Sequence, residues 1–101
     1  MKKKTVGIIG GVGPEATVDV FHWIVDLTPA KQDSDHIPAL IHNNPQVPSR
    51  AEAILHNGED PSPVLINMAK QLEEMGADFL IMPCNTAHYY FDQIQNSISI
   101  P

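Results

Sequence analysis

The sequence has 101 residues, 43% of them hydrophobic, and a formal net charge of -6, which predicts one domain with a modest core and argues against a nucleic-acid partner. No apolar stretch reaches the roughly 20 residues that cross a bilayer, and the run behind the N-terminal lysines is too short for an export signal. Because a single cysteine forms no internal disulfide, we expect a cytoplasmic protein with a reduced thiol and no membrane partner.

The first predicted unit is a strand, a glycine turn and a helix. Residues 5–9 form the β-branched run of a buried parallel strand, which ends at a glycine cluster in residues 10–13. Pro14 suits the first turn of the helix, and Pro29 ends it. The apolar face expected to point inward consists of Val18, Phe21, Ile24 or Val25, and Thr28.

The middle of the chain is predicted to hold a short strand and two helices. Residues 33–38 are expected to form a loop, residues 39–42 a strand, and residues 43–48 an irregular segment because of its two prolines. Ser49 caps a helix that runs to about His56 and yields to Asn57-Gly58. Asp60 is the expected N-cap of the next helix, with Pro61 at its first position and Gly76 after its end. Its apolar stripe contains Leu65, Met68, Ala69, Leu72 and Met75.

The last third continues the alternation of strand and helix. Residues 78–82 are expected to form a strand, residues 87–96 a helix, and residues 98–100 the start of a fourth strand. Tyr90, Phe91 and Ile94 are expected to point inward.

This alternation predicts an α/β fold: a three-layer α/β/α domain with a parallel sheet of about four strands, spanning residues 1–101. Ligands bind beyond the carboxyl ends of the strands in such sheets. The loops at residues 10–14, 43–50 and 83–88 are therefore expected to form the site, with the first and third strands beside it.

Cys84 is the candidate reactive residue of the third loop. It lies between a strand and a helix, where free N–H groups and the helix dipole favour a thiolate, and a free thiol titrates at about 8.5. A buried structural cysteine is the alternative, but the polar Asn85 and Thr86 that follow argue against it.

The residues around Cys84 offer donors for an anionic substrate. Asn85 and Thr86 supply an amide, a hydroxyl and backbone N–H groups for a carboxylate, although Thr86 also suits helix capping. His88, four residues after Cys84, is a further candidate because an imidazolium on the same helix face stabilises a thiolate. A solvent-facing or packed histidine is the more common situation.

Arg50 is the only arginine of the chain and lies at the same sheet edge. A guanidinium is the side chain best shaped to grip a carboxylate through two hydrogen bonds. The alternative is a solvated arginine at a helix start, which is an unfavourable place for a cation because the helix dipole opposes it. This mismatch favours a functional role for Arg50.

Two other kinds of site are not expected. The glycine cluster with Ala16 fits a dinucleotide-binding pattern, but Pro14 deletes a donor and the second strand ends in Asn43 instead of an acidic residue. Metal binding rests only on the weak spacing of Cys84 and His88, with His36 and His42 elsewhere. We therefore expect no metal and no cofactor.

Four segments together resemble the aspartate/glutamate racemase family: residues 7–17, 35–36, 43–50 and 83–88. The resemblance covers essentially the whole chain. It implies racemisation without pyridoxal phosphate, metal or nucleotide, in which the Cα proton leaves on one face and another returns on the opposite face. In relatives, two cysteines do this work.

The resemblance also implies roles for individual residues. Cys84 resembles the first of the two cysteines, and Arg50 resembles the ligand of the side-chain carboxylate of a small amino-acid substrate. Asn85 and Thr86 resemble ligands of the substrate carboxylate, and Gly11 and Gly13 shape the neighbouring loop. Apart from the resemblance, Thr17, Asn43 and His88 are candidates for supporting residues.

The sequence departs from the family in three places. Relatives carry methionine at the position of Val12, and aspartate, arginine and threonine where this chain has residues 49–51. Relatives also have a second α/β domain that bears the partner cysteine. We therefore expect residues 1–101 to act as an N-terminal half that has little or no activity alone and pairs with a C-terminal domain or forms a homo-oligomer.

Two alternative functions stay open. A sibling enzyme, such as a maleate isomerase, hydantoin racemase or malonate decarboxylase, uses a similarly placed cysteine. An inactive half that binds carboxylates or self-associates is the other alternative.

Overall fold

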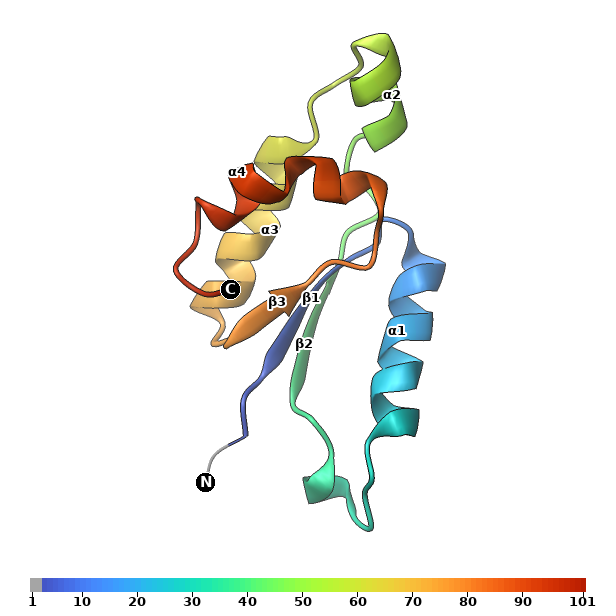
Figure 1. Ribbon diagram of the computed structural model, residues 1–101, viewed down its shortest axis with the longest axis vertical. Coiled ribbons are helices and arrows are strands. Elements are labelled where there is room, and N and C mark those ends of the chain that lie inside the picture. Colours follow the sequence, from blue (N-terminus) through green and yellow to red (C-terminus); the bar gives the residue numbers. More distant parts are fainter. Residues whose placement is uncertain (1–2) are drawn as a thin grey trace.

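The computed structural model describes residues 3–101 as an elongated α/β body with principal extents of 49 × 27 × 18 Å. Three parallel strands lie between helices on both faces, as the sequence predicts (Figure 1). No helix of this part of the chain is both long enough and apolar enough to cross a membrane. The elements are β1 (Val6–Gly10), α1 (Pro14–Leu27), the 3-10 turn η1 (Asp33–Asp35), β2 (Ala39–Asn43), α2 (Arg50–His56), α3 (Ser62–Glu74), β3 (Phe79–Ile81), the 3-10 turn η2 (Thr86–Tyr90) and α4 (Phe91–Gln95).

The sheet has the order β2-β1-β3, so β1 is the central strand and is buried along its whole length. Its two faces meet different helices. Gly7 and Ile9 face α3, and a Cβ at Gly7 would lie 2.9 Å from the Cβ of Ala77. Gly10 faces α1, where a Cβ would lie 2.7 Å from a carbon of Thr17. A strand covered on both faces is continuously apolar, which explains the β-branched run in the sequence.

The main core lies between the sheet and the helices α3 and α4. The stripe of α3 supplies its centre, because Leu65, Met68, Ala69 and Leu72 are all at most 1% exposed. Gly76, at φ 104°, ends the helix, and the N–H of Ala77 returns to the carbonyl of Leu72 at 3.0 Å. Met75 was predicted in the stripe and this is wrong: it follows the last helical residue and is exposed.

The caps around α2 and α3 are close to those predicted. The Oγ of Ser49 accepts the Glu52 N–H at 3.2 Å, and Asn57 ends α2 in the left-handed conformation. The helix α3 begins at Ser62, one residue later than expected. Asp60 still accepts the N–H of Ser62 at 2.9 Å, so a carboxylate serves the helix start as predicted.

The predicted inward face of α1 is wrong in part. Val18, Phe21 and Val25 are exposed, whereas the predicted Ile24 and Thr28 are half-buried, and Thr17 is the buried residue of this helix. The cause is the rotation of α1 about its axis, which is fixed where the Thr17 hydroxyl enters the glycine loop. The side that follows Thr17 at helical spacing contains Val20, and this side faces the sheet.

The segment after Cys84 is not the single helix that was predicted. It forms the 3-10 turn η2 and then the short helix α4. Ala87 and Tyr90 are both buried and lie three residues apart, which is the period of a 3-10 turn. Ile94 points inward as predicted, whereas Phe91 was expected to do so and is 49% exposed.

The predicted fourth strand at residues 98–100 is also wrong, so the described sheet has three strands instead of about four. The backbone N–H groups of Ser99 and Ile100 donate to the Glu73 carboxylate of α3, at 2.8 and 3.1 Å. They are therefore not available for a strand ladder. The chain still returns to the sheet, because the Leu80 N–H donates to the carbonyl of Pro101 at 2.9 Å.

Candidate functional site

The order of the strands brings three loops to one edge of the sheet. From the central strand β1 the chain first adds β2 on one side of β1, and later adds β3 on the opposite side of β1. The strand order therefore reverses between β1 and β3, which is the topological switch point where ligands bind in such sheets. Asn43, at the end of β2, pairs with Gly10 at the end of β1. The helix α2 packs against η2 above this edge (Figure 1). Residues 10–14, 43–50 and 83–88 are therefore neighbours.

The loop after β1 has a close backbone crossing at Gly11. Gly11 has φ 94°, and a Cβ there would lie 2.5 Å from the backbone of Asn44. Its N–H donates to the Thr17 hydroxyl at 3.0 Å, and the Asn44 N–H donates to Gly10 at 3.0 Å. Gly13 differs, because a Cβ there would meet nothing within 4 Å. Gly11 is thus required by its surroundings, and Thr17 holds the loop to α1.

Cys84 lies in a tight turn just after β3. Its N–H donates to the carbonyl of Met82 at 2.8 Å, across Pro83. The sulfur is 3.4 Å from the hydroxyl oxygen of Thr86. Cys84 borders the core but stays partly exposed, so the thiol is not sealed within hydrocarbon.

Five influences act on the ionisation of Cys84. Partial burial raises the pKa of the thiol, because a thiolate loses hydration there. Hydrogen bonds from the Thr86 hydroxyl and the Ala87 N–H lower it, and so do the charge and a hydrogen bond of Arg50. The lowering influences together outweigh burial, and the pKa lies below its usual value. The predicted helix dipole is replaced by individual donors of a 3-10 turn.

Arg50 begins α2 and reaches back over the loop between β2 and α2. Its Nη1 lies 3.5 Å from the carbonyl oxygen of Val47 and 3.4 Å from that of Pro48. Within residues 3–101, its Nε is buried without a hydrogen-bond partner. A guanidinium has five N–H donors, so Arg50 keeps donor capacity for an anion beside Cys84. The two carbonyls also offset the unfavourable position of a cation at a helix start.

The other candidate residues surround these two. Asn85 and Thr86 are exposed at the start of η2, and Asn43 is exposed at the end of β2. His88 does not bond the sulfur. Its Nε2 lies 2.8 Å from the carbonyl oxygen of Met82, and its ring stacks on Phe91.

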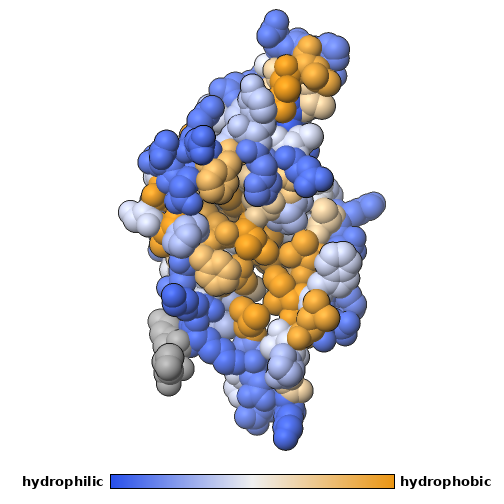
Figure 2. Space-filling model, in the orientation of Figure 1, coloured by the Kyte–Doolittle hydropathy of each residue, from blue (hydrophilic) through white to orange (hydrophobic). Residues whose placement is uncertain are grey.

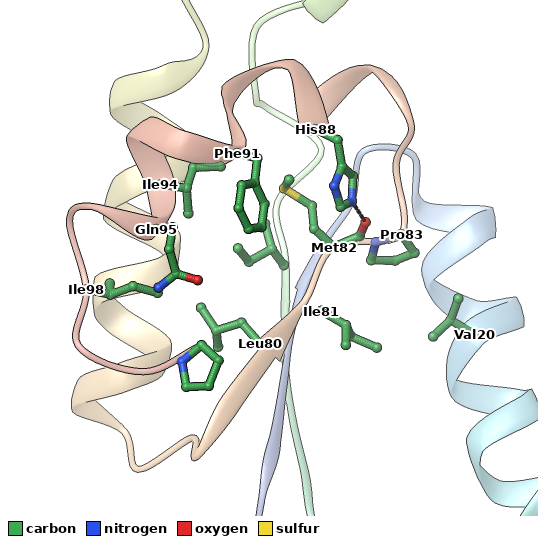
Figure 3. Close-up of a pocket in the computed structure, with 12 residues that line it drawn as sticks. Val20, Leu80, Ile81, Met82, Pro83, His88, Phe91, Ile94, Gln95 and Ile98 are labelled. Carbon is green, nitrogen blue, oxygen red and sulfur yellow. Dashed lines mark hydrogen bonds between the residues drawn. The ribbon is translucent and has the colours of Figure 1, made fainter.

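An apolar groove of about 400 Å³ runs along β3, between α1 and α4 (Figure 2, Figure 3). Leu80, Ile81 and Met82 line it from the sheet, Val20 from α1 and Phe91 from α4. Cys84 and Arg50 do not line this groove. The polar edge with the thiol and this apolar groove are therefore separate features.

Another observation concerns metal ligands. Across residues 3–101, no group of three His, Cys, Asp or Glu side chains is placed to hold a metal ion.

Two features of the site were not predicted from the sequence: the influence of the Ala87 N–H on the thiol, and the Asn44 backbone that leaves no room for a side chain at Gly11. The Asn-Pro dipeptide at 44–45 marked a turn, but no sequence pattern indicated that this turn crosses Gly11.

Comparisons with known proteins agree on one family. A model of the family described as Asp/Glu/Hydantoin racemase matches residues 9–101. The broad specificity amino-acid racemase RacX of Bacillus subtilis (strain 168) is 34% identical over 100 residues, which are 95% of this chain and 43% of that protein.

Two solved structures share the fold. The aspartate racemase of Picrophilus torridus has a TM-score of 0.84 and 40% identity, covering 97% of this chain and 41% of its own. An aspartate racemase homologue from Pyrococcus horikoshii OT3 has a TM-score of 0.78 and 30% identity, covering 100% of this chain and 43% of its own. The chain thus spans about two fifths of the length of these relatives.

Proposed function

The chain belongs to the Asp/Glu/Hydantoin racemase family, and from this premise we propose that Cys84 is the first proton-transferring thiol of a racemase of acidic amino acids. The observation that carries the proposal is the position of this thiol. It is partly exposed at the ligand-binding edge, and Thr86, Ala87 and Arg50 together lower its pKa. A thiolate that forms near neutral pH is a suitable general base.

The reaction is a proton exchange at Cα. The Cys84 thiolate takes the Cα proton and becomes a thiol, and the electron pair stays on the substrate, delocalised into its carboxylate. A second acid on the opposite face then donates a proton to Cα, which inverts the stereocentre. Cys84 is the only cysteine in this sequence, so in this proposal the second acid comes from another polypeptide segment, and no cofactor takes part.

Arg50 is the proposed ligand of the side-chain carboxylate. Its Nε has no partner among residues 3–101, and a carboxylate matches the fork of a guanidinium. Asn85 and Thr86 are the proposed ligands of the α-carboxylate because both are exposed beside the thiol. Gly11 keeps the facing loop close, and Asn43 lies at the same edge.

Protection of the thiol tests substrate binding in the chain as it exists. Aspartate or glutamate is expected to slow the alkylation of Cys84 by iodoacetamide, because the substrate covers the sulfur. Asparagine and glutamine are the matched controls, since they lack the second carboxylate that Arg50 binds. Equal protection by all four amino acids would contradict the role of Arg50, and no protection by any of them would contradict binding.

Deuterium exchange tests the chemistry. In a polypeptide that pairs this chain with the rest of a racemase, racemisation in deuterated water is expected to place deuterium at Cα. Cys84→Ser is expected to abolish that exchange, because a serine hydroxyl is a far weaker acid than a thiol. The chain alone is expected to exchange little or no Cα proton. Normal racemisation by the Cys84→Ser protein would remove Cys84 from the mechanism.

A second candidate function is that of an inactive module that binds carboxylates or self-associates. The exposed apolar residues of α1 favour it, because Val18 is 67% exposed and Trp23 is 59% exposed. An apolar hollow is also open on the face drawn in Figure 2, and Val20 of α1 lines it. A dimeric mass in sedimentation, together with ordinary alkylation kinetics of Cys84, would support the module. A monomer with an activated thiol would support the racemase half.

A further inference from the structure

The carbonyl oxygen of Met82 accepts two hydrogen bonds at the base of the cysteine loop. One comes from the N–H of Cys84 at 2.8 Å, which closes a three-residue turn around Pro83. The other comes from the imidazole Nε2 of His88, also at 2.8 Å (Figure 3). A carbonyl oxygen has two lone pairs and cannot donate, so Nε2 must carry the proton.

This second bond joins the two ends of the segment that holds the sulfur. Met82 directly follows β3, and His88 lies in η2. Between them are Cys84, the Thr86 hydroxyl 3.4 Å from its sulfur, and the Ala87 N–H, which lowers the pKa of the thiol. The distance from the sulfur to these donors therefore depends on how firmly residues 82 and 88 are held together.

The imidazole ring is itself held in place. It stacks on Phe91 with a centroid distance of 6.3 Å and an interplanar angle of 8°. Because the stack fixes the ring plane, Nε2 stays directed at the Met82 carbonyl (Figure 3). The His88 side chain is exposed, so the hydrogen bond from its Nε2 to the Met82 carbonyl forms at the protein surface.

We propose that His88 is a positioning residue for Cys84: its Nε2–H bond to Met82 closes the loop and keeps the sulfur against Thr86 and Ala87. The proposal rests on the proposed function, in which Cys84 transfers the proton. His88 makes no contact with the reacting atoms in this role. Its Nε2 carries a proton in both the neutral and the charged imidazole, so the bond persists in both forms. The charged group that acts on the thiol is Arg50 of α2.

Two substitutions separate this role from mere packing. His88→Phe keeps an aromatic ring that stacks on Phe91 but removes the donor. His88→Gln removes the ring but places an amide donor near the position of Nε2. His22→Gln, on the exposed side of α1, is the matched control. The readout is the pH profile of Cys84 alkylation by iodoacetamide, taken on variants whose far-UV circular dichroism matches the wild type, because an unfolded chain would also show a raised midpoint.

The expected results differ in direction. His88→Phe is expected to move the alkylation midpoint upward and to slow alkylation at pH 7 by about tenfold, which corresponds to one pKa unit. His88→Gln is expected to restore most of the rate, and His22→Gln to leave the profile unchanged. A wild-type profile in His88→Phe would overturn the proposal. A His88→Gln profile like that of His88→Phe would also overturn it, because it would make charge, not the donor, responsible.

A measurement on the unaltered chain covers the case in which a variant does not fold. The 15N spectrum of the His88 ring is expected to show the Nε2-protonated tautomer with a slowly exchanging proton. An Nδ1-protonated tautomer would overturn the proposal. These outcomes are independent of the proposed function. The proposed function fails instead if neither aspartate nor glutamate slows the alkylation of Cys84 and if the alkylation midpoint of the wild-type chain equals that of a free thiol.

Discussion

Arg50 and Cys84 act on one another across the strand-end edge: the positive charge of the guanidinium that begins α2 lowers the pKa of the thiol that follows β3. One side chain thus serves two anions in the proposed mechanism, the thiolate and the substrate carboxylate. In this mechanism the carboxylate binds the same positive charge that lowers the pKa of the thiol. The proposal therefore couples substrate recognition to proton abstraction through Arg50.

The alkylation of the wild-type chain is expected to depend on pH with a midpoint below about 8.5, the value of a free thiol. The net effect of the surroundings lowers the folded-state pKa of Cys84, so the thiolate forms at lower pH. Ionisation therefore favours the folded state above the unfolded pKa, and this contribution is lost as the pH falls through the folded pKa. Alkylation in guanidinium chloride is the control. An equal midpoint in both conditions would contradict the prediction.

Arg50→Met is expected to raise the pKa of the Cys84 thiol and to slow its alkylation at pH 7. The guanidinium favours the thiolate, so its removal shifts the midpoint upward, and each full unit slows the reaction by about tenfold. Arg50→Lys keeps the positive charge and is expected to be intermediate. Lys70→Met, at an exposed position of α3, is the control for net charge. A change of equal size in Lys70→Met would show a general charge effect.

Thr86→Val is expected to raise the midpoint of Cys84 alkylation, because valine cannot donate to the thiolate across the 3.4 Å contact. Thr86→Ser keeps the hydroxyl and is expected to stay close to the wild type. The shape of the side chain changes little in both variants, so the comparison isolates the hydrogen bond. The hydroxyl has no role in ionisation if both variants have the same profile.

Gly11→Ala is expected to destabilise the fold much more than Gly13→Ala. At Gly11 an added Cβ meets the Asn44 backbone at 2.5 Å and φ is 94°, whereas at Gly13 it meets nothing within 4 Å. We expect a loss of about 1–3 kcal/mol for Gly11→Ala from backbone strain alone. For Gly13→Ala we expect a change below about 1 kcal/mol, because alanine is the poorer N-cap but suits the extended backbone there. Urea denaturation of both variants measures the difference. Similar losses in the free energy of unfolding for the two variants would contradict the prediction, because they would mean that both glycines have equivalent surroundings.

Thr17→Val is expected to cost about 1–3 kcal/mol, because it leaves the N–H of Gly11 buried without its 3.0 Å partner. Thr17→Ser retains the hydroxyl and is expected to lose less. Thermal unfolding of the two variants provides the measurement. A stable valine variant would show that water or another group accepts this N–H.

Local patterns predicted most of the elements and the place of the site. The β-branched run at residues 5–9, the Ser49 cap and Gly76 each act through nearby atoms, and the structure has a strand, a helix start and a helix end at these positions. The carboxyl ends of parallel strands share one edge, so the three loops followed from the order of the elements.

The missed features depend on contacts between distant residues. The rotation of α1 is set where Thr17 bonds Gly11, and periodicity alone does not fix which of two adjacent apolar stripes faces the sheet. The segment at residues 98–100 has strand-forming residues, but Glu73 takes its N–H groups. The pairing of Arg50 with Cys84 likewise comes from the fold, not from their spacing in the sequence.

The return of Pro101 to β3 determines what a label at that residue reports. The Pro101 carbonyl bonds the N–H of Leu80, and both residues line the apolar groove (Figure 3). An environment-sensitive fluorophore attached at residue 101 therefore lies beside this hollow. Its emission will change when any molecule displaces water there, whereas a label at Asn57 reports on the tip of α2.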